Sequence, residues 1–357
     1  MINIYNLVGL EIDDAFPWRK DWLSMLGDLP GMKLEQESQP KARIKLIYDQ
    51  ALPIHEMRKI GEGIYVQKRA VFDEKYRLLL ERDTDGTILL RTDNPCVEWV
   101  FWSIQLALLS IGSTFVHGAG AEKDGCATLF ASWGGIGKTA LVAGFINNMN
   151  WKLLGDDLVI VNADGTCCSY PKPMVLYPYH KSVFPEVFSK GKGPVAPVSL
   201  NETLSKVAIK VKPFLRLFPH LLQFARSHNP QSVRLNPSEV FGKHNIALKA
   251  KLDRIIWLDR VNGISVPELH PDDGTLVSRM MGCTIRESDP RCSEILNVAM
   301  GLGIIDSESF YSGWIRNLQS AIQSCQKHIM YLPAEMPVSE VADAVNQLLD
   351  QQKVLSS

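Results

Sequence analysis

The most constraining feature of the sequence is a glycine-rich stretch, ASWGGIGKTAL, at residues 131 to 141. Its glycines precede a lysine and a threonine at the spacing that lets backbone N–H groups converge on phosphate oxygens at the positive end of a helix. The apolar run before it predicts a strand, and the amphipathic run after it predicts a helix. The stretch therefore indicates an α/β fold with a phosphate-binding loop. The residues expected to bind the phosphates are Gly134, Gly135, Ile136, Gly137, Lys138, Thr139 and Ala140.

The loop departs from the common pattern at its start, where Ser132 replaces the first glycine and Trp133 follows it. That glycine eases a tight turn, and serine is the least bulky substitute after alanine. We therefore expect the loop still to bind a nucleotide, with a purely structural loop as the alternative. Trp133 either stacks on a ligand or covers the loop.

Two further motifs flank the loop in the sequence. VHG at 116–118 precedes it, and LLGDD at 153–157 places Asp156 eighteen positions after Lys138. Two adjacent carboxylates repel each other and seldom occur without a cation or a proton that reduces this repulsion. We therefore favour a functional pair over the alternative, in which both acids are simply solvated at the end of a strand. His117 either belongs to the same site or is a hydrogen-bonded core residue.

The histidine-glycine pair, the loop and the acid pair together resemble the catalytic domain of bacterial HPr kinase/phosphorylase and its relatives with a phosphoenolpyruvate carboxykinase-type P-loop. YPKPMVLY at 170–177 is also similar to a Lys/Arg-Pro segment of HPr-kinase-like proteins in peptide and polysaccharide biosynthesis clusters. The resemblance covers about 114 to 177 and extends less closely to about 270.

This resemblance implies an ATP- and Mg²⁺-dependent kinase. Lys138 would bind the β and γ phosphates, and Thr139 would bind the metal. One of the two aspartates, Asp156 or Asp157, would lie near the metal, and the other would take the proton from the attacking hydroxyl. The resemblance leaves open which residue has which role. His117 would lie close to the transferred phosphate. Independently of the resemblance, phosphoryl transfer needs mostly positioning and charge neutralisation, which two such carboxylates supply.

Basic residues provide further candidates for phosphate or substrate contacts. Lys172 lies in the Lys-Pro segment, and Arg260 ends IIWLDR, although solvated or surface roles are the alternative for both. Residues 186 to 254 contain twelve Lys or Arg and four acidic residues. This tract is either a solvated helical surface or a groove for an anionic substrate, at an insertion where acceptor specificity would be built.

The expected acceptor is a hydroxyl of a peptide or protein serine or of a small biosynthetic metabolite. A further motif on which phosphorolysis depends in the namesake enzymes is missing, so phosphorolysis is not predicted. The N-terminal part also differs from that of the namesake, which argues against HPr as the acceptor. The alternatives are a non-catalytic nucleotide-binding or sensing module and, less favoured, a carboxykinase.

The predicted organisation has two parts, a β-rich N-terminal module at 1–95 and a P-loop kinase-like catalytic domain at 96–357. Alternating segments between residues 43 and 92 predict the strands of the first part. In the second, helices are expected at about 95–110, 199–228 and 275–325. A C-terminal helix with Ser339 as its N-cap and a strand GISVPEL are also expected.

Composition and charge restrict the partners and the cellular location that we expect for this protein. The formal net charge of −1 argues against nucleic acid as the main partner, and 46% hydrophobic residues support a buried core. The apolar run at 97–112 contains Glu98 and is short for a membrane span, so a buried helix or a subunit contact is expected. The start lacks a signal-peptide pattern. Seven scattered cysteines, including the adjacent Cys167 and Cys168, predict reduced thiols in a cytoplasmic protein.

Overall fold

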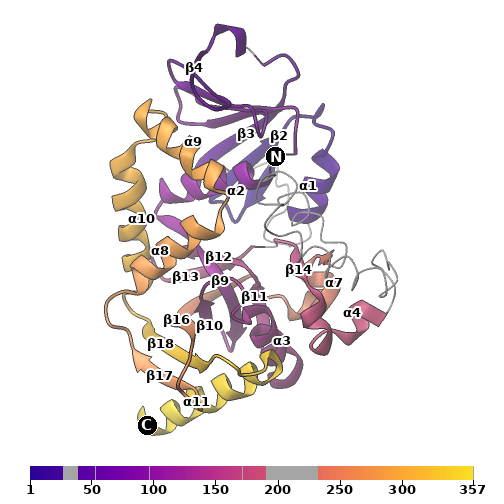
Figure 1. Ribbon diagram of the computed structural model, residues 1–357, viewed down its shortest axis with the longest axis vertical. Coiled ribbons are helices and arrows are strands. Elements are labelled where there is room, and N and C mark those ends of the chain that lie inside the picture. Colours follow the sequence, from indigo (N-terminus) through magenta and orange to yellow (C-terminus); the bar gives the residue numbers. More distant parts are fainter. Residues whose placement is uncertain (27–38, 53, 96, 171, 190–231, 357) are drawn as a thin grey trace, which may run out of the picture.

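A computed structural model describes residues 1–26, 39–52, 54–95, 97–170, 172–189 and 232–356. It has a mixed α/β fold with two large β-sheets, one built from the N-terminal residues and one from the rest of the chain. The two sheets follow one another along the long axis of the molecule (Figure 1).

The first sheet confirms the β-rich character expected for residues 43–92 and adds two strands from the start of the chain. β2, β3 and β8 are parallel neighbours, and the remaining pairs are antiparallel. In spatial order the strands are β1 (Ile2–Ile4), β2 (Val8–Ile12), β3 (Ala42–Tyr48), β8 (Ile88–Thr92), β7 (Leu78–Arg82), β6 (Ala70–Asp73), β5 (Ile64–Gln67) and β4 (Arg58–Gly61).

The second sheet contains the strands around the glycine-rich loop at 131–141. β16 is parallel to both β10 and β18, while β9 is antiparallel to β10, β11 and β12. Its strands are β9 (Ser113–Lys123), β10 (Cys126–Ala131), β11 (Lys152–Gly155), β12 (Leu158–Asn162), β13 (Thr166–Ser169), β16 (Lys249–Val261), β17 (Glu268–Pro271) and β18 (Gln326–Pro333). A separate two-stranded sheet pairs β14 (Met174–Leu176) with β15 (Val233–Leu235).

The helices lie mainly around the second sheet, and α8, α9 and α10 line one side of the molecule (Figure 1). They are α1 (Arg19–Leu26), α2 (Val97–Leu109), α3 (Lys138–Met149), α4 (Pro185–Ser189), α7 (Pro237–Phe241), α8 (Leu276–Glu287), α9 (Pro290–Gly301), α10 (Ser307–Ala321) and α11 (Val341–Ser356).

Three local expectations differ from the structure. The strand expected in GISVPEL begins only at Glu268. Ser339 is not an N-cap, because it lies inside a 3₁₀ turn, Val338–Glu340, and α11 begins at Val341. The helix expected at 199–228, with most of the basic tract 186–254, lies outside the described residues.

The apolar run at 97–112 forms α2, the buried helix expected from its composition. Trp99 and Trp102 are fully buried, and α2 packs against β3 of the first sheet and β9 of the second. A single hydrophobic cluster extends through residues of both sheets, so the core is continuous across the boundary expected at residue 95. Among the described residues, no helix has the length and apolar character needed to cross a bilayer.

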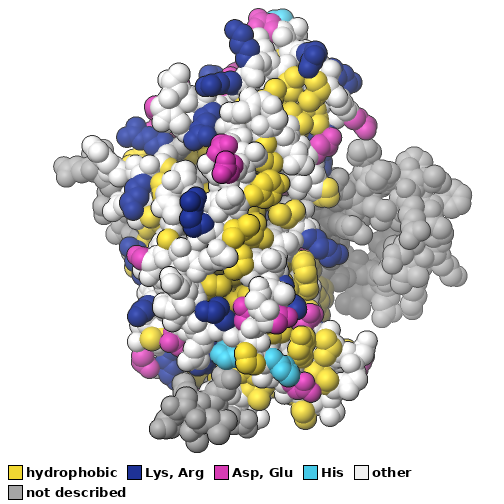
Figure 2. All heavy atoms as spheres, turned by 90° about the vertical axis from the view of Figure 1, so that its left-hand side faces the viewer, with side chains coloured by type: hydrophobic (Ala, Val, Ile, Leu, Met, Phe, Trp, Pro, Cys, Tyr) yellow, Lys and Arg dark blue, Asp and Glu magenta, His cyan; other side chains and the backbone are white. Residues whose placement is uncertain are grey.

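The face formed by α8, α9 and α10 carries a band of hydrophobic side chains between scattered basic ones (Figure 2). Ile285 of α8 and Tyr311 and Ile315 of α10 are each more than a third exposed. Apolar atoms make up much of any folded protein surface, so this band does not by itself identify a partner.

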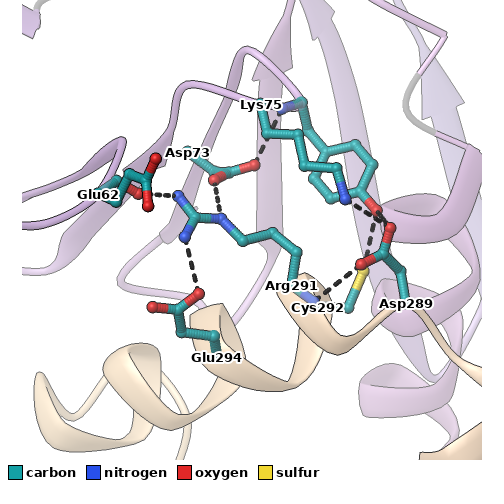
Figure 3. Close-up of polar contacts among 8 residues, drawn as sticks. Glu62, Asp73, Lys75, Asp289, Arg291, Cys292 and Glu294 are labelled. Atoms are coloured by element: carbon teal, nitrogen blue, oxygen red, sulfur yellow. Dashed lines mark hydrogen bonds and ion pairs between the residues drawn. The ribbon is translucent and has the colours of Figure 1, made fainter. Parts of the chain in front are cut away.

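A polar cluster fastens the first sheet to the helices (Figure 3). The guanidinium of Arg291, at the start of α9, donates to the fully buried carboxylate of Asp73 at 2.6 Å and to the carbonyl oxygen of Glu62 at 2.6 Å. Asp289, the N-cap of α9, accepts from Lys75 Nζ at 2.7 Å and from the Tyr76 hydroxyl at 2.6 Å. The turn between β6 and β7 is therefore tied to the junction of α8 and α9.

Removing the charge of Arg291 should destabilise the protein strongly, because the buried carboxylate of Asp73 would lose its cation. We expect Arg291→Met to lower the free energy of unfolding by about 3–5 kcal/mol. Arg77→Met is the matched control, since Arg77 pairs with Asp93 at 2.7 Å but is 46% exposed, and should cost less than about 1 kcal/mol. Urea unfolding followed by circular dichroism measures both. Equal losses would contradict the role given to the buried pair.

Candidate functional site

The register of three strands brings the predicted site residues to one place. Ala131, the last residue of β10, pairs with Gly118 of β9, and His117 of β9 pairs with Leu158, the first residue of β12. The Gly118 N–H also donates to the Asp157 carbonyl oxygen at 2.9 Å. The start of the phosphate loop, His117 and the acid pair therefore lie side by side.

The loop connects β10 to α3 through a backbone that requires glycine. Gly137 precedes α3 with a φ of 111°, a conformation that residues with side chains rarely adopt. Lys138 is buried, and its Nζ donates to the carbonyl oxygens of Ser132 at 2.8 Å and Trp133 at 3.0 Å. Burial lowers the pKa of Lys138, against the opposing effect of the nearby carboxylates, chiefly Asp157. An ammonium satisfied only by loop carbonyls can exchange them for anionic oxygens.

The two unusual residues at the start of the loop are packed into the protein. Ser132 is fully buried, and its hydroxyl donates to the Trp133 carbonyl oxygen at 3.1 Å. The Trp133 ring meets Trp257 edge to face, with ring centroids 5.4 Å apart, and the Arg286 guanidinium lies 5.7 Å from its centroid. Of the two roles expected for Trp133, these contacts favour covering the loop.

Asp156 follows β11 in a tight turn and is buried. Gly155 permits this turn, because a side chain there would come within 2.3 Å of the Leu158 carbonyl oxygen. Asp156 Oδ1 has no hydrogen-bond partner among the described residues. The pKa of Asp156 rises to about 6, mainly through burial and also through the adjacent charge of Asp157, although the Thr139 hydroxyl and the Lys138 ammonium offset part of the rise.

Asp157 has the opposite environment. Its Oδ1 lies 2.9 Å from His117 Nε2, and its Oδ2 forms an ion pair with Lys172 Nζ. Burial would raise the pKa of Asp157, but Lys172 and His117 outweigh it and hold that pKa well below its usual value. The two neighbouring carboxylates thus differ. Asp156 has one oxygen without a hydrogen-bond partner among the described residues, whereas both oxygens of Asp157 are held, one by His117 and the other by Lys172.

Arg260, a candidate for phosphate contact, lies behind the loop. Its Nε donates to the Ile136 carbonyl oxygen at 3.1 Å, and its Nη1 donates to the carbonyl oxygens of Ala334 at 2.9 Å and Met336 at 2.7 Å. Nη2 is buried without a partner among the described residues. The contacts fasten the loop to the segment after β18, which differs from the surface role considered for this arginine.

Helix α8 contributes two side chains that the sequence did not single out. Cys283 Sγ lies 3.2 Å from the Ser132 carbonyl oxygen and 3.3 Å from His117 Nδ1. Glu287, one turn further along, accepts from the Gly134 N–H at 3.2 Å through Oε1. Both residues lie about 150 positions after the loop, with no motif around them. Only the i, i+4 spacing, which puts them on one helix face, hinted at a shared role.

The residues expected to hold a metal ion are Thr139, Asp156 and Asp157. No group of three His, Cys, Asp or Glu side chains in the described part of the chain could hold one alone. Mg²⁺ at nucleotide sites usually takes one or two carboxylates together with phosphate oxygens and water. The unpartnered Asp156 Oδ1 and the adjacent Thr139 hydroxyl fit that kind of site.

Comparison with known proteins gives weak structural likenesses and no match by sequence. No family model matches the chain, and no curated protein matches it. Among solved structures it is similar to the Hpr(Ser) kinase/phosphatase from Coxiella burnetii, with 9% sequence identity and a TM-score of 0.32 over 68% of this chain and 98% of that one. A likeness of this degree does not establish a shared family or activity.

The contrasting carboxylates predict opposite effects of two neighbouring substitutions. Because the folded state raises the pKa of Asp156 from 3.8 to about 6, its contribution to stability is greatest below pH 4 and is lost as the pH rises through 6. In nucleotide-free protein, Asp156→Asn should therefore raise the free energy of unfolding at pH 7.5 by roughly 1–3 kcal/mol, with little effect at pH 4.

Asp157→Asn should instead lower stability at pH 7.5, because it leaves Lys172 without its counter-charge. Urea unfolding with EDTA present, at both pH values, measures the two variants. Destabilisation of the same size by both would contradict the difference in environment.

Proposed function

We propose that this protein is an ATP- and Mg²⁺-dependent phosphotransferase that moves the γ-phosphate to a hydroxyl of a peptide or protein serine or of a small metabolite. The observation that carries the proposal is the pair of unlike carboxylates, Asp156 and Asp157, placed against a glycine-rich loop and its buried lysine. A structural loop has no need of a buried carboxylate oxygen without a partner, since such a group is costly.

Different residues of the site would bind the phosphates and the metal ion. The amides of the loop and Lys138 bind the phosphates in place of the carbonyls that now satisfy the lysine. Thr139 and Asp156 would hold Mg²⁺, whose charge would offset that of the transferred phosphoryl group. This cation would also relieve the desolvation that raises the pKa of Asp156.

Asp157 faces the acceptor. It is half-buried, and Lys172 and His117 fix both of its oxygens, so it can orient an incoming hydroxyl and take its proton as the new bond to the γ-phosphorus forms and the bond from that phosphorus to ADP breaks. This assigns the metal to Asp156 and the acceptor to Asp157, an order that the sequence left open. Lys172 is 45% exposed and would attract an anionic acceptor.

Two substitutions separate nucleotide binding from transfer. Lys138→Ala should abolish the rise in melting temperature caused by Mg-ATP, whereas Lys152→Ala, an exposed lysine of β11, should leave it unchanged. Asp157→Asn should keep the rise but reduce phosphate release from ATP, with water as acceptor, by at least about 100-fold. Asp124→Asn, in the exposed turn between β9 and β10, is its matched control.

Several outcomes would contradict the proposal. ATP stabilisation that survives Lys138→Ala would place the nucleotide elsewhere. Hydrolysis unaffected by Asp157→Asn would remove the acceptor role of that residue. Binding of ATP by the wild-type protein with no phosphate release, and no transfer to serine peptides or hydroxylated metabolites, would favour the non-catalytic sensing module.

Glu287 offers a further test, because its carboxylate accepts from an amide that the phosphates would use. Glu287→Gln keeps the size of the side chain but removes the negative charge, so ATP should bind about threefold to tenfold more tightly. Calorimetric titration with Mg-ATP measures the change, and Glu308→Gln, an exposed glutamate of α10, is the control. Unchanged or weaker binding would show that Glu287 does not compete with the nucleotide.

A further inference from the structure

Helix α8 places the thiol of Cys283 between the phosphate loop and His117. The side chain is fully buried, with Sγ 3.2 Å from the Ser132 carbonyl oxygen and 3.3 Å from His117 Nδ1. Burial raises the pKa of this thiol to about 12, so it remains a neutral S–H group. A neutral thiol offers one weak donor and one weak acceptor.

The hydrogen-bond partners of His117 constrain which of its nitrogens carries the proton. Nε2 lies 2.9 Å from Asp157 Oδ1, and an ionised carboxylate only accepts hydrogen bonds, so this contact favours the tautomer with its hydrogen on Nε2. In the neutral ring, Nδ1 then has a lone pair and needs a donor. The Cys283 thiol is the group placed to supply it, because its S–H can rotate between Nδ1 and the Ser132 carbonyl oxygen.

We propose that Cys283 is a positioning residue that holds the imidazole of His117 in its Nε2–H form and aims it at Asp157. The thiol completes a chain of contacts that begins at Lys138 and passes through the Ser132 carbonyl oxygen, Cys283 and His117 to Asp157. The phosphate-binding lysine and the acceptor-facing carboxylate are thereby held in one network. The catalytic consequence rests on the proposed function, whereas the effect on His117 does not.

The competing explanation is that Cys283 only fills space, as buried cysteines often do. Two substitutions distinguish the explanations. Cys283→Val keeps an apolar side chain of comparable volume but removes the donor. Cys283→Ser keeps a rotating donor that can reach both partners. Filling space predicts that valine is the better replacement, and positioning predicts that serine is.

The direct test is the tautomer of His117 in the nucleotide-free protein. Nitrogen-15 NMR of histidine-labelled protein at pH 8 resolves the two ring nitrogens, and the His117 signals are those that vanish in His117→Gln. We expect the Nε2–H form in the wild type and in Cys283→Ser, and a mixture of both tautomers in Cys283→Val. A wild-type spectrum with Nδ1–H, or an unchanged Nε2–H form in Cys283→Val, would overturn the proposal.

Phosphate release from Mg-ATP then gives the functional consequence. Cys283→Val should lower kcat about tenfold while the Kd for ATP changes less than twofold, and Cys283→Ser should recover most of kcat. Cys325→Ala is the control, since that buried thiol also lies near a carbonyl oxygen, Ile322 O at 3.4 Å. It precedes Gln326, which pairs with Arg254 of β16, whereas the loop end of β10 pairs with Trp257.

The two readouts fail independently of each other. Absence of any ATP turnover by the wild-type protein would count against the proposed function, while the NMR result would still decide the role of Cys283. A kcat restored better by valine than by serine would count against positioning even if the kinase activity were confirmed.

Discussion

The site depends on the pairing of β9 between β10 and β12. Backbone hydrogen bonds fix this register, and a shift of one residue would turn every side chain of a strand to the opposite face. The pairing sets Gly118 beside Ala131 and His117 beside Leu158, so the histidine and the acid pair reach the start of the phosphate loop. The positions of these candidate side chains therefore follow from main-chain geometry rather than from contacts among the side chains themselves.

Within that frame, electrostatics distinguishes two residues of the same type. Asp156 is enclosed beside Thr139 with one oxygen unpaired, while Asp157, the next residue, lies between His117 and Lys172. Successive residues in a turn point in different directions, so the pKa values of these two aspartates move apart although they are adjacent in the sequence. A pair of carboxylates with separate roles is a common device in active sites.

Helix α8 links the site to the rest of the molecule. Cys283 and Glu287 contact Ser132 and Gly134 of the loop, and the α8–α9 junction that follows is held by the first sheet through Asp289 and Arg291. The unusual start of the loop is explained by these contacts, because Ser132 and Trp133 pack where α8 crosses. The first sheet thus supports the wall of the site although it supplies none of the predicted site residues.

The sequence alone predicted the glycine-rich loop at 131–141 with its flanking strand and helix, the β-rich first part and the buried helix at 97–112. Each of these features depends on residues that are close together in the sequence, because glycines, turn residues and the period of apolar residues determine local backbone conformation. The sequence also indicated Asp156, Asp157, His117 and Lys172 as candidates, because each lies in a short recognisable motif.

The tertiary structure decided what local patterns cannot encode. Strand register decides that Asp156 is buried and that Asp157 pairs with Lys172. The contact of the Cys283 thiol with His117 depends on α8, a helix about 150 residues after the loop in the sequence. Local spacing was misleading at Ser339, where a 3₁₀ turn precedes the helix. The physical reason is that desolvation and hydrogen bonding act between groups brought together by folding, whatever their separation along the chain.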